Sequence, residues 1–103
     1  SGHSPVLFNK LAGTYLQTRK YDEAETLLKE SLAFFPDFYT TLANMGELYF
    51  SNQEYETARV YFEKAVRINP FNPFAHMRLI RVYDKLGLVR EKELQARQFN
   101  YID

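Results

Sequence analysis

Two stretches of the chain align without a gap: LAGTYLQTRKYDEAETLLKESLAFFP (Leu11–Pro36) and MGELYFSNQEYETARVYFEKAVRINP (Met45–Pro70). They lie 34 positions apart. Self-similarity at a fixed period of about 20 to 50 residues is the sequence signature of stacked repeats. The residues that set the register are Leu11 and Met45, Ala12 and Gly46, Tyr15 and Tyr49, Tyr21 and Tyr55, Ala24 and Ala58, and Pro36 and Pro70; a third copy begins at Pro73 and places Leu79 and Tyr83 equivalently.

Each copy has the pattern of a helical hairpin. The second begins with apolar residues three and four positions apart, which predicts an amphipathic helix. A polar turn at 51–53 follows, and then a second apolar stripe that ends at Asn69-Pro70. Proline lacks a backbone donor and disfavours helical geometry in the residue before it. The stripes are Leu42, Met45, Leu48 and Tyr49 on the first helix, and Tyr55, Ala58, Tyr61, Phe62, Ala65 and Val66 on the second.

Small residues recur where the two helices of a hairpin should touch. Gly46 and Ala58 occupy such positions, and helix axes about 8 Å apart require small side chains at the contact. The third copy departs from this pattern. Ile80 replaces the small residue, Lys92 replaces the alanine, and Ala96 replaces a large residue. Its second helix, at about 89–101, is therefore expected to pack differently.

Composition argues against several functional classes. The 103 residues include 13 basic and 13 acidic side chains, so no overall positive charge favours nucleic acid. There is no cysteine, and no apolar run is long enough for membrane insertion. No cluster of ligands predicts a metal, no glycine-rich loop predicts a phosphate cofactor, and no reactive pair predicts an enzyme. His76 takes the place of Phe8 and Leu42 and is interpreted as a packing residue.

The pattern resembles the tetratricopeptide repeat family from Pro5 to about Asp103. Its elements are a small residue three before a tyrosine, an alanine nine after it and a closing proline. The resemblance implies an all-α fold, a right-handed α-solenoid of antiparallel helical hairpins. The RNA-reading pentatricopeptide type, with a period of about 35, is the main alternative. We expect an expression-tag remnant at 1–4, repeat 1 at 5–38, repeat 2 at 39–72 and a degenerate repeat 3 at 73–103, the repeats together forming one domain.

The resemblance also implies a place for function. Such solenoids have an inner, concave face lined mainly by the first helix of each repeat, and this face holds a protein or peptide. Helical spacing places on it side chains away from the apolar stripes, which packing alone does not dictate. The groove candidates are Asn9, Lys10, Asn44, Glu47, Phe50, Phe74, Met77, Arg78, Arg81 and Lys85.

Three of these candidates form a basic ridge. Arg78, Arg81 and Lys85 lie three, four and seven positions apart, and the third repeat carries six basic and four acidic residues. This ridge would form a positive end of the groove next to Asn44. It therefore predicts a partner with an acidic or carboxylate-bearing segment. The alternative is a solvated helix face that Asp84 partly neutralises.

Apolar candidates also have two interpretations. Phe50, Phe74 and Met77, with Leu16, could anchor the side chains of a bound peptide, or they could extend the packing between repeats. Aromatic residues at helical spacing usually belong to a core, which favours packing.

One subgroup of the family clamps the Glu-Glu-Val-Asp tail of heat-shock chaperones with five residues. At the corresponding places this chain keeps Asn44 and Arg78 but has Asn9, Gly13 and Phe74 instead of lysine, asparagine and lysine. The loss of two cations predicts that the chain does not bind that tail tightly.

The sequence thus predicts a scaffold that binds a protein or peptide, without catalysis. The alternative is an architectural or oligomerisation segment of a larger protein, which packs through the end of the last helix. Apolar residues at that end motivate it, because terminal repeats usually need a polar outer face. The contact candidates are Phe99, Tyr101 and Ile102.

Overall fold

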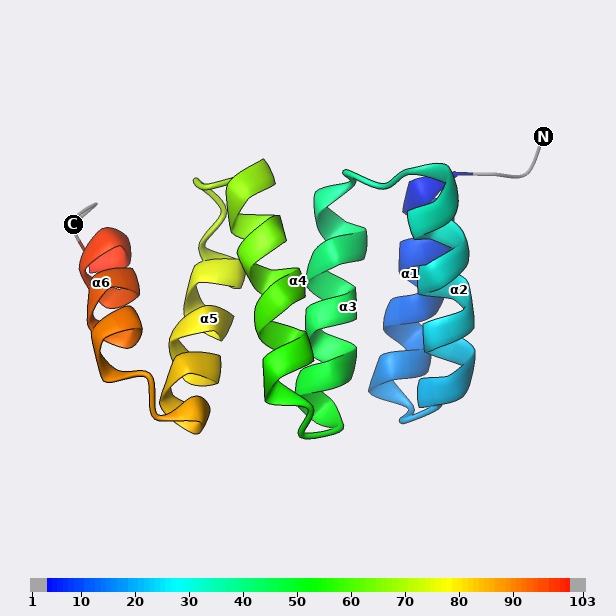
Figure 1. Ribbon diagram of the computed structural model, residues 1–103. Coiled ribbons are helices and arrows are strands. Elements are labelled where there is room, and N and C mark those ends of the chain that lie inside the picture. Colours follow the sequence, from blue (N-terminus) through cyan, green and yellow to red (C-terminus); the bar gives the residue numbers. More distant parts are fainter. Residues whose placement is uncertain (1–3, 101–103) are drawn as a thin grey trace.

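The computed structural model describes the backbone of residues 4–100 and the side chains of residues 4–98. Within this part the chain forms six α-helices and no strand, which confirms the all-α prediction (Figure 1). None of these helices is long and apolar enough to cross a membrane. They are α1 (Pro5–Gln17), α2 (Tyr21–Phe34), α3 (Tyr39–Ser51), α4 (Tyr55–Ile68), α5 (Pro73–Leu86) and α6 (Val89–Asn100).

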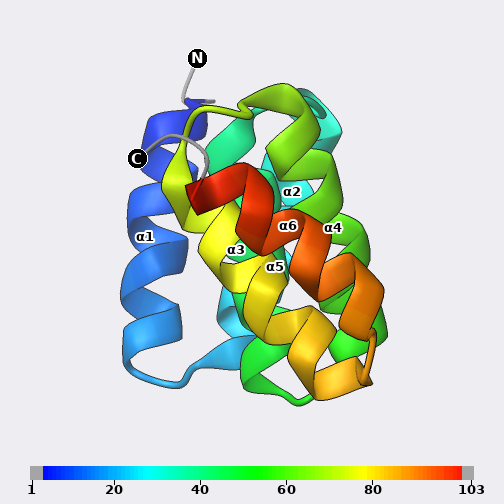
Figure 2. The ribbon, with the colours of Figure 1, turned by 90° about the vertical axis from the view of Figure 1, so that its left-hand side faces the viewer.

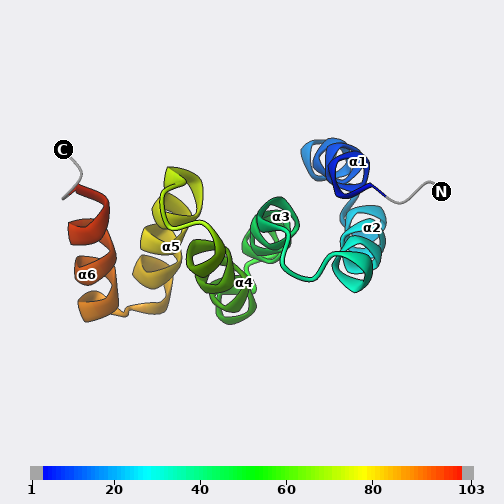
Figure 3. The ribbon, with the colours of Figure 1, turned by 90° about the horizontal axis from the view of Figure 1, so that it is seen from above.

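The helices stand in a row in which each packs against the next one along the chain. The row measures 43 × 25 × 20 Å. Seen from above, α1, α3 and α5 lie along one side, and α2 and α4 lie along the other (Figure 3). The view along the row shows α6 at its end, in front of α5 (Figure 2). The arrangement is that of a solenoid of helical hairpins.

The turn inside each hairpin uses a left-handed backbone conformation at the same repeat position. Arg19, Gln53 and Gly87 have φ of 61°, 63° and 72°, and they are equivalent residues of the three successive repeats. Only the third is a glycine, for which this conformation carries no steric cost. Pro36 and Pro70 follow the residues at which α2 and α4 stop, as the sequence predicts.

The core consists of two clusters along the row. Ala12, Ala24, Leu28, Met45 and Leu48 join the first hairpin to the second. A second cluster, centred on Phe62 and Leu79, joins the second hairpin to the third. The small-residue prediction is confirmed at Gly46, because a Cβ there would lie 2.7 Å from ring carbons of Phe62.

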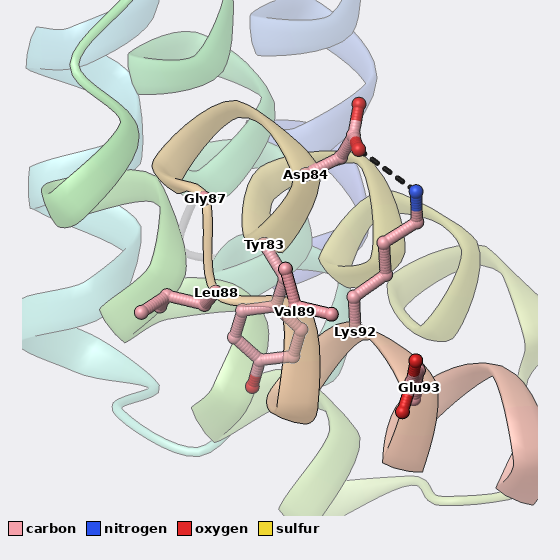
Figure 4. Close-up of a pocket in the computed structure, with 7 residues that line it drawn as sticks. All are labelled: Tyr83, Asp84, Gly87, Leu88, Val89, Lys92 and Glu93. Carbon is pink, nitrogen blue, oxygen red and sulfur yellow. Dashed lines mark hydrogen bonds and ion pairs between the residues drawn. The ribbon is translucent and has the colours of Figure 1, made fainter.

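The third hairpin packs differently, as expected from its sequence. Among the described side chains of α6 only Gln95 is buried, whereas α2 and α4 each bury three residues. Lys92, at the alanine position, places Nζ 2.8 Å from Oδ1 of Asp84 (Figure 4). Gln95 donates to Nδ1 of His76, whose Nε2 donates to the carbonyl of Pro70 at 2.6 Å. His76 is therefore a packing residue, as predicted, but it is buried and not half-buried.

Candidate functional site

An open pocket of about 490 Å³ crosses all three hairpins near their turns. We call it the three-hairpin pocket. It contains five of the predicted groove residues, which come from helices far apart in the sequence. It also contains Arg19 and Gln53 from the turns and Tyr21 and Tyr55 from second helices, which a pattern on the first helices does not include. The lining residues are Arg19 and Tyr21; Glu47, Phe50, Ser51, Gln53 and Tyr55; and Arg78, Arg81 and Lys85.

One cation of the pocket is engaged in a double contact between helices. Arg78 on α5 places Nε 2.8 Å from Oε1 of Glu47 on α3 and Nη2 3.3 Å from Oε2. Its guanidinium also lies over the ring of Phe74, 4.8 Å from the centroid. Bidentate pairs of this kind are geometrically specific. Arg78 and Glu47 therefore connect the second hairpin to the third and largely neutralise one another.

The other cations of the pocket have no such partner. The guanidinium of Arg81 lies 5.7 Å from the centroid of the Phe50 ring, and Phe50 meets Tyr55 edge-on at 5.4 Å. Among the residues that the structure describes, neither Arg81, Lys85 nor Arg19 forms an ion pair. The pocket thus has an excess of positive charge.

Two asparagine candidates lie in an internal network at the junction of α1 with α3. Asn9 donates from Nδ2 to the carbonyl of Pro5 at 2.7 Å and to Oγ1 of Thr41 at 2.8 Å. Its Oδ1 accepts a hydrogen bond from Asn44 Nδ2 at 2.9 Å. Asn9 is only 6% exposed, so the expectation that packing does not dictate this position is wrong. The helical pattern could not show that α1 and α3 approach each other here.

The aromatic candidates Phe50 and Phe74 pack against the second core cluster, and Phe74 lies 6.3 Å from the Phe62 ring. Both rings therefore take part in packing between repeats, and Phe50 also lines the three-hairpin pocket. Met77 is half exposed, and Lys10 lies on the rim of a separate, mostly apolar pocket of about 210 Å³ with Val6. Met77 and Lys10 are therefore exposed and available for contact with a partner, but they lie outside the three-hairpin pocket.

Tyrosines at equivalent positions donate to carboxylates across the hairpin junctions. Tyr49 Oη lies 2.9 Å from Glu25 Oε2, and Tyr83 Oη lies 2.7 Å from Glu63 Oε2. Burial and this hydrogen bond raise the pKa of Tyr49 to about 12, and the same causes raise the pKa of Tyr83. The bond from Tyr49 lowers the pKa of Glu25. A phenol with a raised pKa stays protonated and donating, which suits a structural role.

Smaller cavities lie elsewhere, one of about 390 Å³ lined by residues of α2, α3 and α4 with the segment between α2 and α3, and another between α5 and α6. The one between α5 and α6 holds about 170 Å³, and the Asp84–Lys92 ion pair spans it (Figure 4). In the described residues, no three His, Asp or Glu side chains are grouped as metal ligands would be. The C-terminal contact candidates Tyr101 and Ile102 lie outside the described residues, as does the side chain of Phe99.

Comparison with known families agrees with this architecture. Two family models, both described as tetratricopeptide repeat, match residues 7–34 and 39–72, and together they cover more than half of the chain. The matched ranges contain α2 and α3 with α4, so the first two hairpins carry the similarity. No curated protein gives a significant match.

Proposed function

We propose that this chain, which belongs to the tetratricopeptide repeat family, holds a segment of a partner protein against the side formed by α1, α3 and α5. We call this side the odd-helix face. Repeats of this family generally act as scaffolds for protein–protein interaction and are typically not catalytic. The proposal adds the location of binding to that general role.

The observation that carries the proposal is the three-hairpin pocket. It is the place where side chains from every hairpin converge, so an extended segment could contact all three at once. Arg81 and Lys85 line it and remain exposed. Met77, half exposed on the same helix, offers an apolar contact on this face. Aromatic and arginine side chains of this kind are enriched among residues that dominate binding energy.

A matched pair of substitutions tests the location. Met77 on α5 is 50% exposed and Val60 on α4 is 47% exposed, so glutamate at either position should disturb folding little. Peptides would first be selected for binding to the unchanged chain. We expect Met77→Glu to weaken the selected peptides about tenfold, because an unpaired charge in an interface is costly, and Val60→Glu to leave them unchanged. Equal effects, or an effect of Val60→Glu alone, would place binding elsewhere.

A specific observation also supports the architectural alternative, at the first helix. Leu7 and Leu11 on α1 are 62% and 46% exposed, whereas their equivalents in the second repeat, Thr41 and Met45, are fully buried against the preceding hairpin. Exposed apolar positions with buried equivalents suggest that α1 packs against a further helical segment. Sedimentation velocity tests this, since Leu7→Glu/Leu11→Glu should abolish any association of the chain with itself. A monomer at every concentration would exclude self-association through α1.

A further inference from the structure

We infer that the three-hairpin pocket selects an acidic stretch of the partner, with several carboxylates in an extended segment. This inference rests on the proposed function, because it concerns the chemistry of a segment bound at the odd-helix face. It uses residues outside the inner-face positions considered in the sequence, namely Arg19 in the first turn and Tyr21 and Tyr55 on the second helices.

The first step of the argument is the charge balance. Four cations line the pocket, Arg19, Arg78, Arg81 and Lys85, with a single carboxylate, Glu47. Both oxygens of that carboxylate contact Arg78. Three positive side chains from the first and third hairpins therefore remain around one opening without an ion pair among the described residues, and the Asp84 carboxylate that Lys85 attracts lies outside the pocket lining. An anionic guest would supply the missing partners.

The second step is that the central cation is held in place before any ligand binds. The guanidinium of Arg81 lies over Phe50, and the rings of Phe50 and Tyr55 form a T-shaped pair. A long side chain loses much rotamer entropy when it is ordered, so a contact that orders it in advance favours binding. Arginine presents a planar set of donors that fits a carboxylate, and Arg81 keeps them available in this position.

The third step concerns the polar neighbours and the size of the site. Tyr21, Ser51, Gln53 and Tyr55 also line the pocket. Their side chains carry hydroxyl or amide groups, which can donate to a carboxylate oxygen. The excess of charge is local, since the whole chain carries 13 basic and 13 acidic residues. A local cationic patch fits a short acidic segment, whereas the backbone of a nucleic acid requires a longer basic surface.

The test uses labelled peptides of about 12 residues, which extended at about 3.3 Å per residue nearly match the 43 Å length of the row. One peptide carries four glutamates between glycine and serine flanks, a second has glutamines instead, and a third carries phosphoserines. Fluorescence anisotropy should show binding of the glutamate peptide, weakened as ionic strength rises from about 0.05 M to about 0.5 M. The glutamine peptide should not bind.

Substitutions locate the binding. Arg81→Gln and Lys85→Gln should each weaken the glutamate peptide about threefold, and together about tenfold. Arg97→Gln, on the exposed part of α6, is the matched control and should have no effect. Glu47→Gln should strengthen binding about threefold, because it removes the one carboxylate of the pocket and releases Arg78. A gain of affinity of this kind cannot result from loss of folding.

The outcomes separate this inference from the proposed function. Equal binding of the glutamate and glutamine peptides, or an equal loss with Arg97→Gln, would overturn the acidic selectivity. If the selected peptides are neutral or basic and still respond to Met77→Glu, the proposed function holds and this inference is wrong. If the phosphoserine peptide alone binds, the site recognises phosphate and not carboxylate, and the inference is wrong in its ligand. If no selected peptide responds to Met77→Glu, the proposed function itself fails.

Discussion

The two junctions between hairpins use the same positions of the repeat but differ in chemistry. At the first, Ser31 and Thr41 are fully buried and lie 3.0 Å apart, Oγ to Oγ1. At the equivalent positions of the second, Ala65 and Ala75 are fully buried instead. One junction therefore combines a hydrogen-bonded polar cluster with apolar packing, and the other relies on apolar packing at the same positions. The repeat pattern determines which positions make contact but not which side chains occupy them.

The tyrosine at each junction also keeps its position in the repeat while its surroundings change. Tyr49 donates to Glu25, which pairs with Lys29 one turn later on α2. In the second junction the order of charges along the helix is reversed, with Arg59 first and Glu63 one turn later. Tyr83 donates to Glu63 accordingly. An exchange of charges between neighbouring turns thus preserves the hydrogen bond, because both turns lie within reach of the phenol.

The largest expected effect concerns the small residue inside the second hairpin. Gly46→Ala should lower the free energy of unfolding by about 3 kcal/mol, since the new Cβ would overlap the buried ring of Phe62. Urea unfolding followed by circular dichroism measures it. Gly13→Ala is the control, because no atom lies within 4 Å of a Cβ there, and it should be neutral or stabilising.

A second substitution sharpens the comparison of the two hairpins. Ala12 and Leu28 share the first core cluster and are the first-repeat equivalents of Gly46 and Phe62. Adding Phe62→Leu to Gly46→Ala reproduces that pair, so it should restore part of the lost stability. If Phe62→Leu is equally destabilising with either residue at position 46, the steric explanation is wrong.

The next largest effect should arise at the first junction. Thr41→Val keeps the shape of the side chain and removes the hydroxyl that joins Asn9 to Ser31. We expect a loss of about 2 kcal/mol, because buried donors are left without partners. Ser31→Ala should cost less, since Thr41 keeps its bond to Asn9. A loss for Thr41→Val no larger than that for Ser31→Ala, again in urea, would mean that the polar cluster is not important for stability.

A smaller gain is expected in the hairpin turns. Gln53→Gly should raise the free energy of unfolding by up to about 1 kcal/mol, because Gln53 has φ of 63° and glycine tolerates this conformation. The third turn already has Gly87 at this position, so the substitution makes the second turn resemble it. Thermal melting measures the gain, and Asn52→Gly, one residue earlier with φ of −88°, should instead be neutral or destabilising.

The smallest effect should appear at high pH. The pKa of Tyr49 is about 12 in the folded chain, above its ordinary value of 10.0. A raised pKa gives a stabilising contribution that is complete below pH 10.0 and is lost as the pH rises toward about 12. Tyr49→Phe should therefore reduce the fall in urea midpoint over this range. If Tyr49→Phe leaves the pH dependence of the urea midpoint unchanged, ionisation of Tyr49 is not coupled to unfolding.

Much of the architecture could be predicted from the sequence. The repeat period, the stops before Pro36 and Pro70 and the unusual third hairpin follow from local patterns, and the helices agree with them. The candidate site was predicted only in part. Five groove candidates line the three-hairpin pocket, but Arg19 and Tyr55 could not be selected because no pattern within one helix relates turns of different hairpins.

The sequence by itself determined which residues form helices and which face each helix buries, because helix periodicity and proline geometry act within a few residues along the chain. Only the tertiary structure decided which groove candidates remain available. It buries Asn9 between α1 and α3, engages Arg78 with Glu47 and leaves Arg81 exposed over an aromatic ring. The reason is physical: the approach of one hairpin to the next depends on contacts between residues far apart along the chain, such as Asn9 and Thr41.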